Sequence, residues 1–283
     1  MKIVIRNPEK YIPENSKENI FLAFDVNNLY LGSGFVFPYF NYEATYEHPF
    51  NIFIDVNVPS NEQEVKDAIF DKLIIRAEAI RKDNKIKVNS RVYGGAASHD
   101  RDKISYLVSK GFIADEGTYL YEKKLSISEH SSKSIDGVAF KEYKMELEKD
   151  KSNYIQIHNQ ISSRKIDMIM LTAYMSNNLW TNFTAFHDDK LIGTIMIYEK
   201  VEDGTKRRIG HVEFLFVLNE FRVKGIATQL MQMAFEYFLS NNINISQLEV
   251  WNINKRAVSL YQTLGYRFFK ETETYPGINY YCE

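Results

Sequence analysis

The feature that most constrains the fold is a strand that passes into a helix between residues 211 and 238. His211–Leu218 (HVEFLFVL) is a run of β-branched and aromatic residues, which predicts a buried strand. Gly225 follows, and five apolar side chains then recur at helical spacing and share one face: Ala227, Leu230, Met231, Ala234 and Phe238. A strand that leads into an amphipathic helix is typical of a mixed α/β domain.

Further elements surround this strand and helix. Phe183–Phe186 and Leu191–Tyr198 predict a hairpin with a polar turn. Leu248–Trp251 predicts a short strand, and Arg256–Leu264 a short helix that Gly265 ends. The Tyr-rich end of the chain predicts two more strands. The expected order is therefore β, β, β, α, β, α, β, β.

The first half shows a weaker copy of this order. Phe21–Asp25 (FLAFD) is similar to Phe183–His187 (FTAFH), and Lys103–Phe112 (KISYLVSKGF) is similar to Ala257–Tyr266 (AVSLYQTLGY). An internal duplication is the simplest explanation, with chance similarity of short α/β patterns as the rival. Residues 126–134 (SISEHSSKS) are polar and Ser-rich, so we expect a linker there, between a domain at 1–125 and a domain at 135–283.

Composition limits the classes of function. The chain has 283 residues, of which 45% are apolar and 25% charged, as in folded globular proteins. A net charge of −2 lacks the basic footprint of a nucleic-acid partner. The start of the chain is too short and polar for a secretion signal or a membrane span, and no histidines have the spacing of a helical metal pair. We expect a cytoplasmic protein that binds no nucleic acid, membrane or metal.

The segment Val217–Leu230 (VLNEFRVKGIATQL) carries the chemistry. A helix start leaves several backbone N–H groups unpaired near the positive end of the helix dipole, which favours an anion. Gly225 and Ala227 leave room for a phosphate close to the backbone, while Arg222 and Lys224 can add charge. The segment lacks the Gly-Lys-Ser/Thr ending of ATP- and GTP-binding loops and the fingerprint of NAD-binding domains.

Three motifs in order resemble the GNAT (GCN5-related N-acetyltransferase) family. Arg222–Ala227 (RVKGIA) resembles its pyrophosphate loop, Arg/Gln-x-x-Gly-x-Gly/Ala, in which backbone amides hold coenzyme A. Glu213–Leu218 resembles the fourth strand, and Asn254–Tyr266 resembles the signature N-x-x-A-x-x-L-Y-x-x-x-G-F/Y. The motifs lie in the second half, and residues 1–125 resemble the family by topology alone. The resemblance implies an α/β fold (α+β mixed sheet) with two GNAT-like acyl-CoA N-acyltransferase domains in tandem.

The resemblance also implies an activity: transfer of acetyl from acetyl-CoA to a primary amine of a small molecule or peptide by direct attack on the thioester. Glu213 is the implied base, directly or through water, and Tyr261 the implied acid that protonates the departing thiolate. Backbone N–H groups near Phe216–Leu218 would polarise the carbonyl. The implied cofactor-binding residues are Phe216, Val217, Leu218, Asn219, Arg222, Val223, Lys224, Gly225, Ile226, Ala227, Thr228, Asn254 and Tyr261.

Plainer interpretations of these residues stay open. Glu213 could be a rim carboxylate or an amine-binding residue, and Tyr261 a packing aromatic. His211 lies on the same strand face as Glu213 and is expected to be structural rather than a second base. Arg222 and Lys224 could be solvated loop charges.

The sequence does not identify the amine acceptor. We expect it to be lined by Glu213, by residues 159–180 and by the chain end around 275–281, with Tyr174 and Trp180 in the core. Two other functions stay open. One is a tandem GNAT-like aminoacyltransferase that uses charged tRNA, and the other is a non-catalytic acyl-CoA-binding module. A monomer, in which the halves form a pseudo-dimer, and a homodimer are both compatible with the sequence.

The first half departs from the family pattern. The loop at 59–65 (PSNEQEV) has no glycine and places two carboxylates where a phosphate would sit. Leu107 stands in the place of Tyr261, and Asp100 in the place of Asn254. We therefore expect a degenerate first domain that has lost cofactor binding and serves as a wall of the acceptor site.

Overall fold

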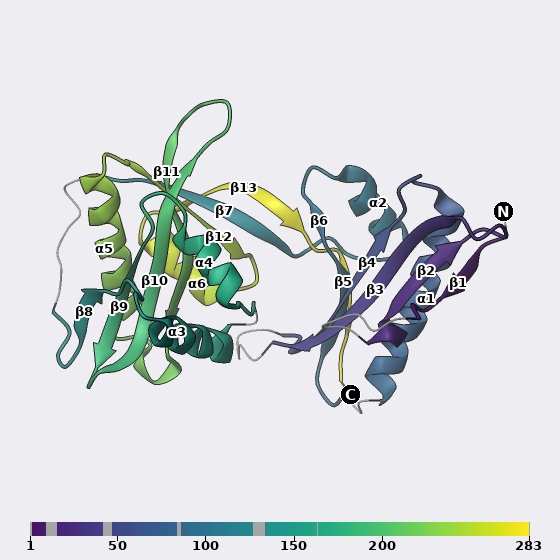
Figure 1. Cartoon of the computed structure of the whole chain (residues 1–283), viewed down its shortest axis with the longest axis horizontal. Helices are drawn as coiled ribbons and strands as arrows, with labels where there is room; N and C mark the ends of the chain where they lie inside the picture. The colour runs from purple at the N-terminus through teal and green to yellow at the C-terminus, as the bar shows by residue number, and fades with distance from the viewer. Residues whose placement is uncertain are drawn as a thin grey trace. The chain divides into compact units, whose positions relative to one another are not determined.

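The structure is a computed structural model that describes residues 2–9, 16–41, 47–83, 86–126, 134–162 and 164–282. The chain divides into two compact units, and each is described here by itself (Figure 1). Unit 1 comprises Met1–Gly117 and Thr272–Glu283, and unit 2 comprises Thr118–Glu271.

Unit 1 is built on a sheet with the strand order β1-β2-β3-β4-β5-β14. Its pairs are antiparallel except β4 with β5, which is parallel. The elements are β1 (Val4–Arg6), η1 (Lys17–Asn19), β2 (Ile20–Phe24), β3 (Tyr30–Phe40), β4 (Phe50–Asn57), α1 (Gln63–Asp83), β5 (Ser90–Gly94), β6 (Ala96–Ala97), α2 (Arg101–Ser109) and β14 (Gly277–Tyr280).

The core of unit 1 lies between this sheet and α1. Apolar residues of α1 recur every four positions and are all buried: Val65, Ile69, Leu73 and Ala77. They pack against buried residues of the central strands, including Ile52 and Ile54 of β4. β2 and α2 lie at the two stretches, Phe21–Asp25 and Lys103–Phe112, that are similar to the second half of the sequence.

A buried arginine fastens the last strand to unit 1. Arg91 on β5 is 1% exposed, and its guanidinium donates to Asn279 Oδ1 at 2.8 Å and to the Tyr275 carbonyl at 3.0 Å. The same guanidinium forms ion pairs with Asp115 at 2.6 Å and Glu116 at 3.1 Å. Loss of these partners would leave a buried positive charge uncompensated, so β14 and β5 depend on each other.

Unit 2 is built on the sheet order β13-β7-β12-β11-β10-β9-β8, and β6 pairs with Glu273 and Thr274 at the end of β13. The elements are β7 (Gly117–Lys124), β8 (Ala139–Glu142), α3 (Glu148–Ile161), α4 (Met168–Met175), β9 (Thr181–His187), β10 (Lys190–Val201), β11 (Arg208–Val217), η3 (Asn219–Phe221), α5 (Ile226–Ser240), β12 (Ile245–Trp251), α6 (Lys255–Thr263) and β13 (Arg267–Thr274). The predicted hairpin, the helix after Gly225 and the helix before Gly265 are all present.

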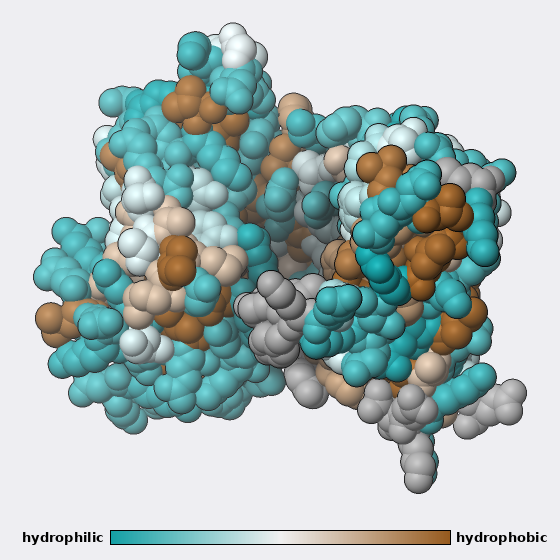
Figure 2. All heavy atoms as spheres, turned by 45° about the vertical axis from the view of Figure 1, so that its right-hand side comes forward, coloured by the Kyte–Doolittle hydropathy of each residue, from teal (hydrophilic) through white to brown (hydrophobic). Residues whose placement is uncertain are grey.

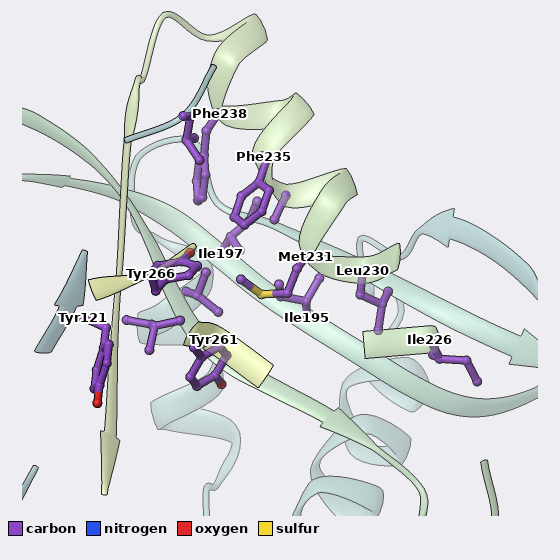
Figure 3. Packing of buried hydrophobic residues seen from close by; sticks show 14 of the residues in the cluster. Tyr121, Ile195, Ile197, Ile226, Leu230, Met231, Phe235, Phe238, Tyr261 and Tyr266 are labelled. Carbon is purple, nitrogen blue, oxygen red and sulfur yellow. The ribbon is translucent and has the colours of Figure 1, made fainter. Parts of the chain in front are cut away.

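Helices cover both faces of this sheet. Successive residues of a strand point to opposite faces, and β10 shows this directly. Ile195 and Ile197 belong to a core cluster with α5 and α6, as Figure 3 shows, whereas Met196 lies in a cluster with Tyr154 of α3 and Leu171 of α4. Each face of the sheet therefore has its own hydrophobic core.

The two units do not divide at the predicted linker. Residues 127–133 of that linker lie outside the described residues. The chain passes from one unit to the other between Gly117 and Thr118 and again between Glu271 and Thr272. As a result β7 pairs with β12 in unit 2, and β14 pairs with β5 in unit 1. Each unit thus contains one strand from the opposite half of the sequence.

The face of the molecule in Figure 2 is mostly hydrophilic, with hydrophobic residues in separate patches. Within the described residues no helix is long and apolar enough to cross a membrane.

Candidate active site

The central strands of unit 2 separate partway along the sheet. β11 pairs in parallel with β12 over Gly210–Val212 and Ser246–Leu248. Beyond this point β12 continues beside β7, while Phe214–Val217 pairs with β10 and does not pair with β12 among the described strands. The divergence opens backbone groups of β11 toward the space where β12 would otherwise pair.

A β-bulge lies where the strands separate. On β10 the register shifts between Met196, which pairs with Phe214, and Ile197, which pairs with Val212. Glu213 is therefore the extra residue of the bulge. A bulge bends its strand and redirects the side chain it carries, which explains both the separation from β12 and the position of the Glu213 carboxylate.

The end of β11 is braced by the loop that follows. The Leu218 N–H donates to the Ile192 carbonyl at 2.8 Å, so this amide is used by the sheet and is not one of the expected carbonyl-polarising groups. Because strand amides alternate in direction, the N–H of Val217 faces the open side. The Val217 carbonyl accepts from Arg222 Nε at 2.9 Å, so Arg222 holds the loop against the strand.

The loop then turns into α5 through two residues in the left-handed region. Val223 has φ 63° and Gly225 has φ 84°. Gly225 is the N-cap of α5, and no side chain caps the helix. Glycine adopts this conformation freely, whereas a valine there is strained, and such strain is concentrated at functional sites.

The turn and the first turn of α5 present a set of open amides. The described part of the chain places no hydrogen-bond acceptor on the N–H groups of residues 223–228. Val223, Lys224 and Gly225 are exposed, and an added Cβ at Gly225 would meet only Ile135 within 4 Å. Converging amides at the start of a 15-residue helix form an anion site. This is the geometry that a diphosphate requires.

Glu213 lies in a closely packed polar cluster. Its side chain is 9% exposed; Oε2 accepts from the Tyr198 hydroxyl at 2.8 Å and lies 3.3 Å from His211 Nε2. Burial alone would raise the pKa of the carboxyl, but hydrogen bonds from His211 and Tyr198 and the charge of Arg164 lower this pKa to about 2. The group is a permanent carboxylate near neutral pH. It is therefore better suited to hold an ammonium or a water molecule than to keep a proton.

His211 meets Glu213 as the shared strand face predicts, and it is buried. Burial lowers the pKa of the imidazole, opposed by Glu213, while nearby Lys200 lowers it further. Lys200 Nζ lies 3.1 Å from the same Nε2 atom. His211 therefore stays neutral near pH 7 and links Glu213 to an exposed lysine.

Comparison with known proteins decides the family. The model of the acetyltransferase (GNAT) family matches residues 145–266. This part of the chain belongs to the GNAT family. N-alpha-acetyltransferase 30 of Schizosaccharomyces pombe is 31% identical over 94 residues, which cover 33% of this chain and 62% of that protein. This chain thus spans less than two thirds of that relative.

Solved structures extend the likeness to both units. A GCN5-related N-acetyltransferase from Sphaerobacter thermophilus aligns with a TM-score of 0.51 and 13% identity over 98% of this chain and 95% of that one. Another from Anabaena variabilis aligns with a TM-score of 0.58 and 10% identity over 93% of this chain and 63% of that one. At such identities the likeness shows the fold. The whole chain therefore has the architecture of these GNAT structures.

Tyr261 is carried on α6 and lies in the core of the GNAT unit. The residue is 8% exposed, and its ring meets Tyr266 edge-on at 5.9 Å (Figure 3). Burial raises the pKa of the Tyr261 phenol to about 12, so the hydroxyl stays protonated near pH 7 and is able to donate a proton. Both the acid role and the packing role remain compatible with this position.

Asn254 is the N-cap of α6. Its side chain accepts from the Ala257 N–H at 3.2 Å. Asp100 occupies the same place in unit 1, where it caps α2 and accepts from the Lys103 N–H at 3.1 Å. The matched caps agree with the sequence alignment of the two halves. Contact of Asn254 with pantetheine stays a prediction.

The second face of the sheet supplies one residue that the sequence did not single out, Arg164. Arg164 reaches Glu213 Oε1 at 3.3 Å and donates to the Tyr174 hydroxyl at 2.8 Å. Tyr174 also packs edge-on against Phe214, and Trp180 packs against the core cluster of α3 and α4. Within the predicted acceptor segment, Arg164 and Tyr174 are thus next to the carboxylate. The segment 275–281 lies in unit 1, so its predicted lining role stays open.

Unit 1 has a cavity of about 440 Å³ where β4 ends and α1 and α2 begin. Three carboxylates line it, those of Asp55, Asp100 and Asp102, and Asp55 pairs with Lys103 at 2.6 Å. Two lysines, Lys66 and Lys103, also line it, so three carboxylates against two ammonium groups give a net charge of −1, which does not favour a diphosphate. This charge is compatible with the expected loss of coenzyme A binding in unit 1, which stays a prediction. The described residues contain no group of His, Cys, Asp and Glu that could hold a metal ion.

Proposed function

We propose that unit 2 is an N-acetyltransferase that moves acetyl from acetyl-CoA to a primary amine of a small molecule or peptide. The observation that carries this proposal is the row of open amides from residue 223 to residue 228, next to a strand that has separated from its neighbour. The amides would receive the diphosphate of coenzyme A. The open edge of β11 would pair with the pantetheine arm, so the thioester would lie beside the bulge.

The residues around the bulge suit attack of an amine on a thioester. The Glu213 carboxylate would attract the ammonium form of an acceptor and, as the proposed base, would pass its proton on to solvent, directly or through water, without keeping it. The Val217 N–H faces the gap and would donate to the carbonyl oxygen as negative charge develops on it. The amine nitrogen then bonds to the carbonyl carbon, the carbon–sulfur bond breaks, and the Tyr261 hydroxyl would protonate the thiolate.

The proposal can be tested by binding and turnover on the full chain. Acetyl-CoA binds the folded state, so at 100 times its Kd it should add about 2.7 kcal/mol of stability. For a unit of this size we expect a rise in melting temperature of roughly 5–10 °C. Release of the coenzyme A thiol across a library of amines would then identify acceptors. No thermal shift at millimolar acetyl-CoA would overturn the proposal, and a shift without turnover would favour a non-catalytic acyl-CoA-binding module.

A further inference from the structure

The two oxygens of Glu213 have different surroundings. Oε2 is fixed from the sheet by Tyr198 at 2.8 Å and by His211 at 3.3 Å. Oε1 meets Arg164 Nη1 at 3.3 Å, and the arginine side chain is 61% exposed, against 9% for Glu213. The inner oxygen therefore belongs to the scaffold. The outer oxygen faces the side from which an acceptor can arrive.

Arg164 lies beside the outer oxygen of Glu213, and only some of its N–H donors have partners in the described part of the chain. One Nη donates to Glu213 and the other to the Tyr174 hydroxyl at 2.8 Å, and the guanidinium carbon lies 5.8 Å from the centroid of the Phe214 ring. A guanidinium has five N–H donors, so three have no partner in the described part of the chain. These donors are free for an anionic group, and a carboxylate matches their planar geometry.

An acceptor amine enters such a site as an ammonium. If it binds Glu213 Oε1, it comes next to the Arg164 guanidinium, and two positive charges at this distance repel each other. Lys200, which contacts His211 at 3.1 Å, adds further positive charge beside the cluster. An acceptor that carries its own carboxylate near the amine removes this conflict, because the carboxylate takes the open donors of Arg164 while the ammonium takes Glu213.

We propose that the acceptor is a small zwitterion, of the chemical class of a free amino acid, which binds Glu213 through its ammonium and Arg164 through its carboxylate. This inference rests on the proposed function and narrows its substrate class. Arg164 is then a specificity-determining residue. It lies 49 residues from Glu213 in the sequence, on the segment between α3 and α4.

The test compares free amino acids with their C-terminal amides as acceptors for the full chain with acetyl-CoA. The wild type should prefer the acid of each productive pair by at least about tenfold in kcat/KM. Arg164→Ala should remove this preference, mainly through KM for the acid, and Arg164→Lys should restore part of it. Lys165→Ala is the matched control, because it removes a neighbouring positive charge whose ammonium donates to the backbone carbonyls of Asn159 and Ser162. It should leave the acid-to-amide ratio unchanged.

Two results would overturn the inference. One is equal use of acids and amides by the wild type. The other is faster turnover of simple amines by Arg164→Ala with no loss on acids, since Arg164 would then be an internal cation that the substrate displaces. Calorimetric titration of the same acids and amides needs no turnover. If acetyl-CoA fails to bind, the proposed function is lost. Tighter calorimetric binding of the acids than of the amides, dependent on Arg164, would still support the binding of a zwitterion at this site. Equal binding of acids and amides would overturn it.

Discussion

Tyr198 on β10 donates a 2.8 Å hydrogen bond to Glu213 on β11. This bond joins the bulge to the neighbouring strand and helps to keep the carboxyl ionised. The carboxylate therefore has a fixed orientation before any acceptor arrives, which is the condition for effective electrostatic positioning.

Glu213 should make unit 2 sensitive to acid. Its folded pKa of about 2 lies below the ordinary value of 4.5, so the unfolded chain binds more protons as the pH falls. The stabilisation, on the order of 3 kcal/mol, is complete above pH 4.5 and is lost as the pH falls toward 2. Glu213→Gln should flatten the dependence of the unfolding free energy on pH over this range. Glu236→Gln, on the exposed side of α5, is the control, and equal slopes for both variants would contradict the assignment.

Gly225→Glu should abolish stabilisation by acetyl-CoA, because it places a carboxylate among the amides of the α5 N-terminus. The φ of 84° also strains any side chain there, by about 1–2 kcal/mol. Gly225→Ala shares this strain without the charge and should keep most of the thermal shift. Gly204→Glu, at φ 83° in the β10–β11 turn, should keep all of it. Loss of the shift in all three variants would point to strain rather than to an anion site.

Tyr261→Phe should slow turnover roughly 10- to 100-fold while acetyl-CoA binds as before, because only the proton donor is removed. Tyr266→Phe is the matched variant in the same core. Its hydroxyl lies 2.5 Å from Ser246 Oγ, so that change should lower stability and leave turnover per folded molecule intact. Steady-state rates together with thermal shifts distinguish the two. Normal turnover by Tyr261→Phe would assign that residue to packing.

Arg91→Leu should destabilise unit 1 by about 3–5 kcal/mol, because it leaves the buried Glu116 carboxylate without its partner. Arg101→Leu, at the exposed start of α2, should change stability by less than about 0.5 kcal/mol. Denaturant unfolding that resolves the two units would measure both. A small effect of Arg91→Leu would mean that β14 is held by its strand pairing alone.

The sequence predicted the elements whose signals are local. The β9–β10 hairpin, the apolar face of α5 and the glycines after α2 and α6 all depend on residues within one turn or one strand, and Gly111 and Gly265 indeed have φ values of 86° and 87°. The Arg164–Glu213 contact could not be predicted, since it depends on how α3 and α4 pack on the sheet.

The sequence likewise could not predict to which sheet β7 and β14 belong. Neither strand carries a local signal that selects its sheet, and their partners lie far away in the sequence. A Ser-rich stretch shows where a chain is exposed, but it does not tell which sheet the strand before it joins.

The exchange of these strands affects how the protein is made. Arg91 and Asn279 are 188 residues apart, so a ribosome that adds about 5–20 residues per second completes unit 1 roughly 10–40 seconds after β5 emerges. Until then β5 remains an exposed edge that nascent chains could pair with. A gene cut at the Ser-rich stretch would leave each fragment one strand short, so the halves would have to be expressed together.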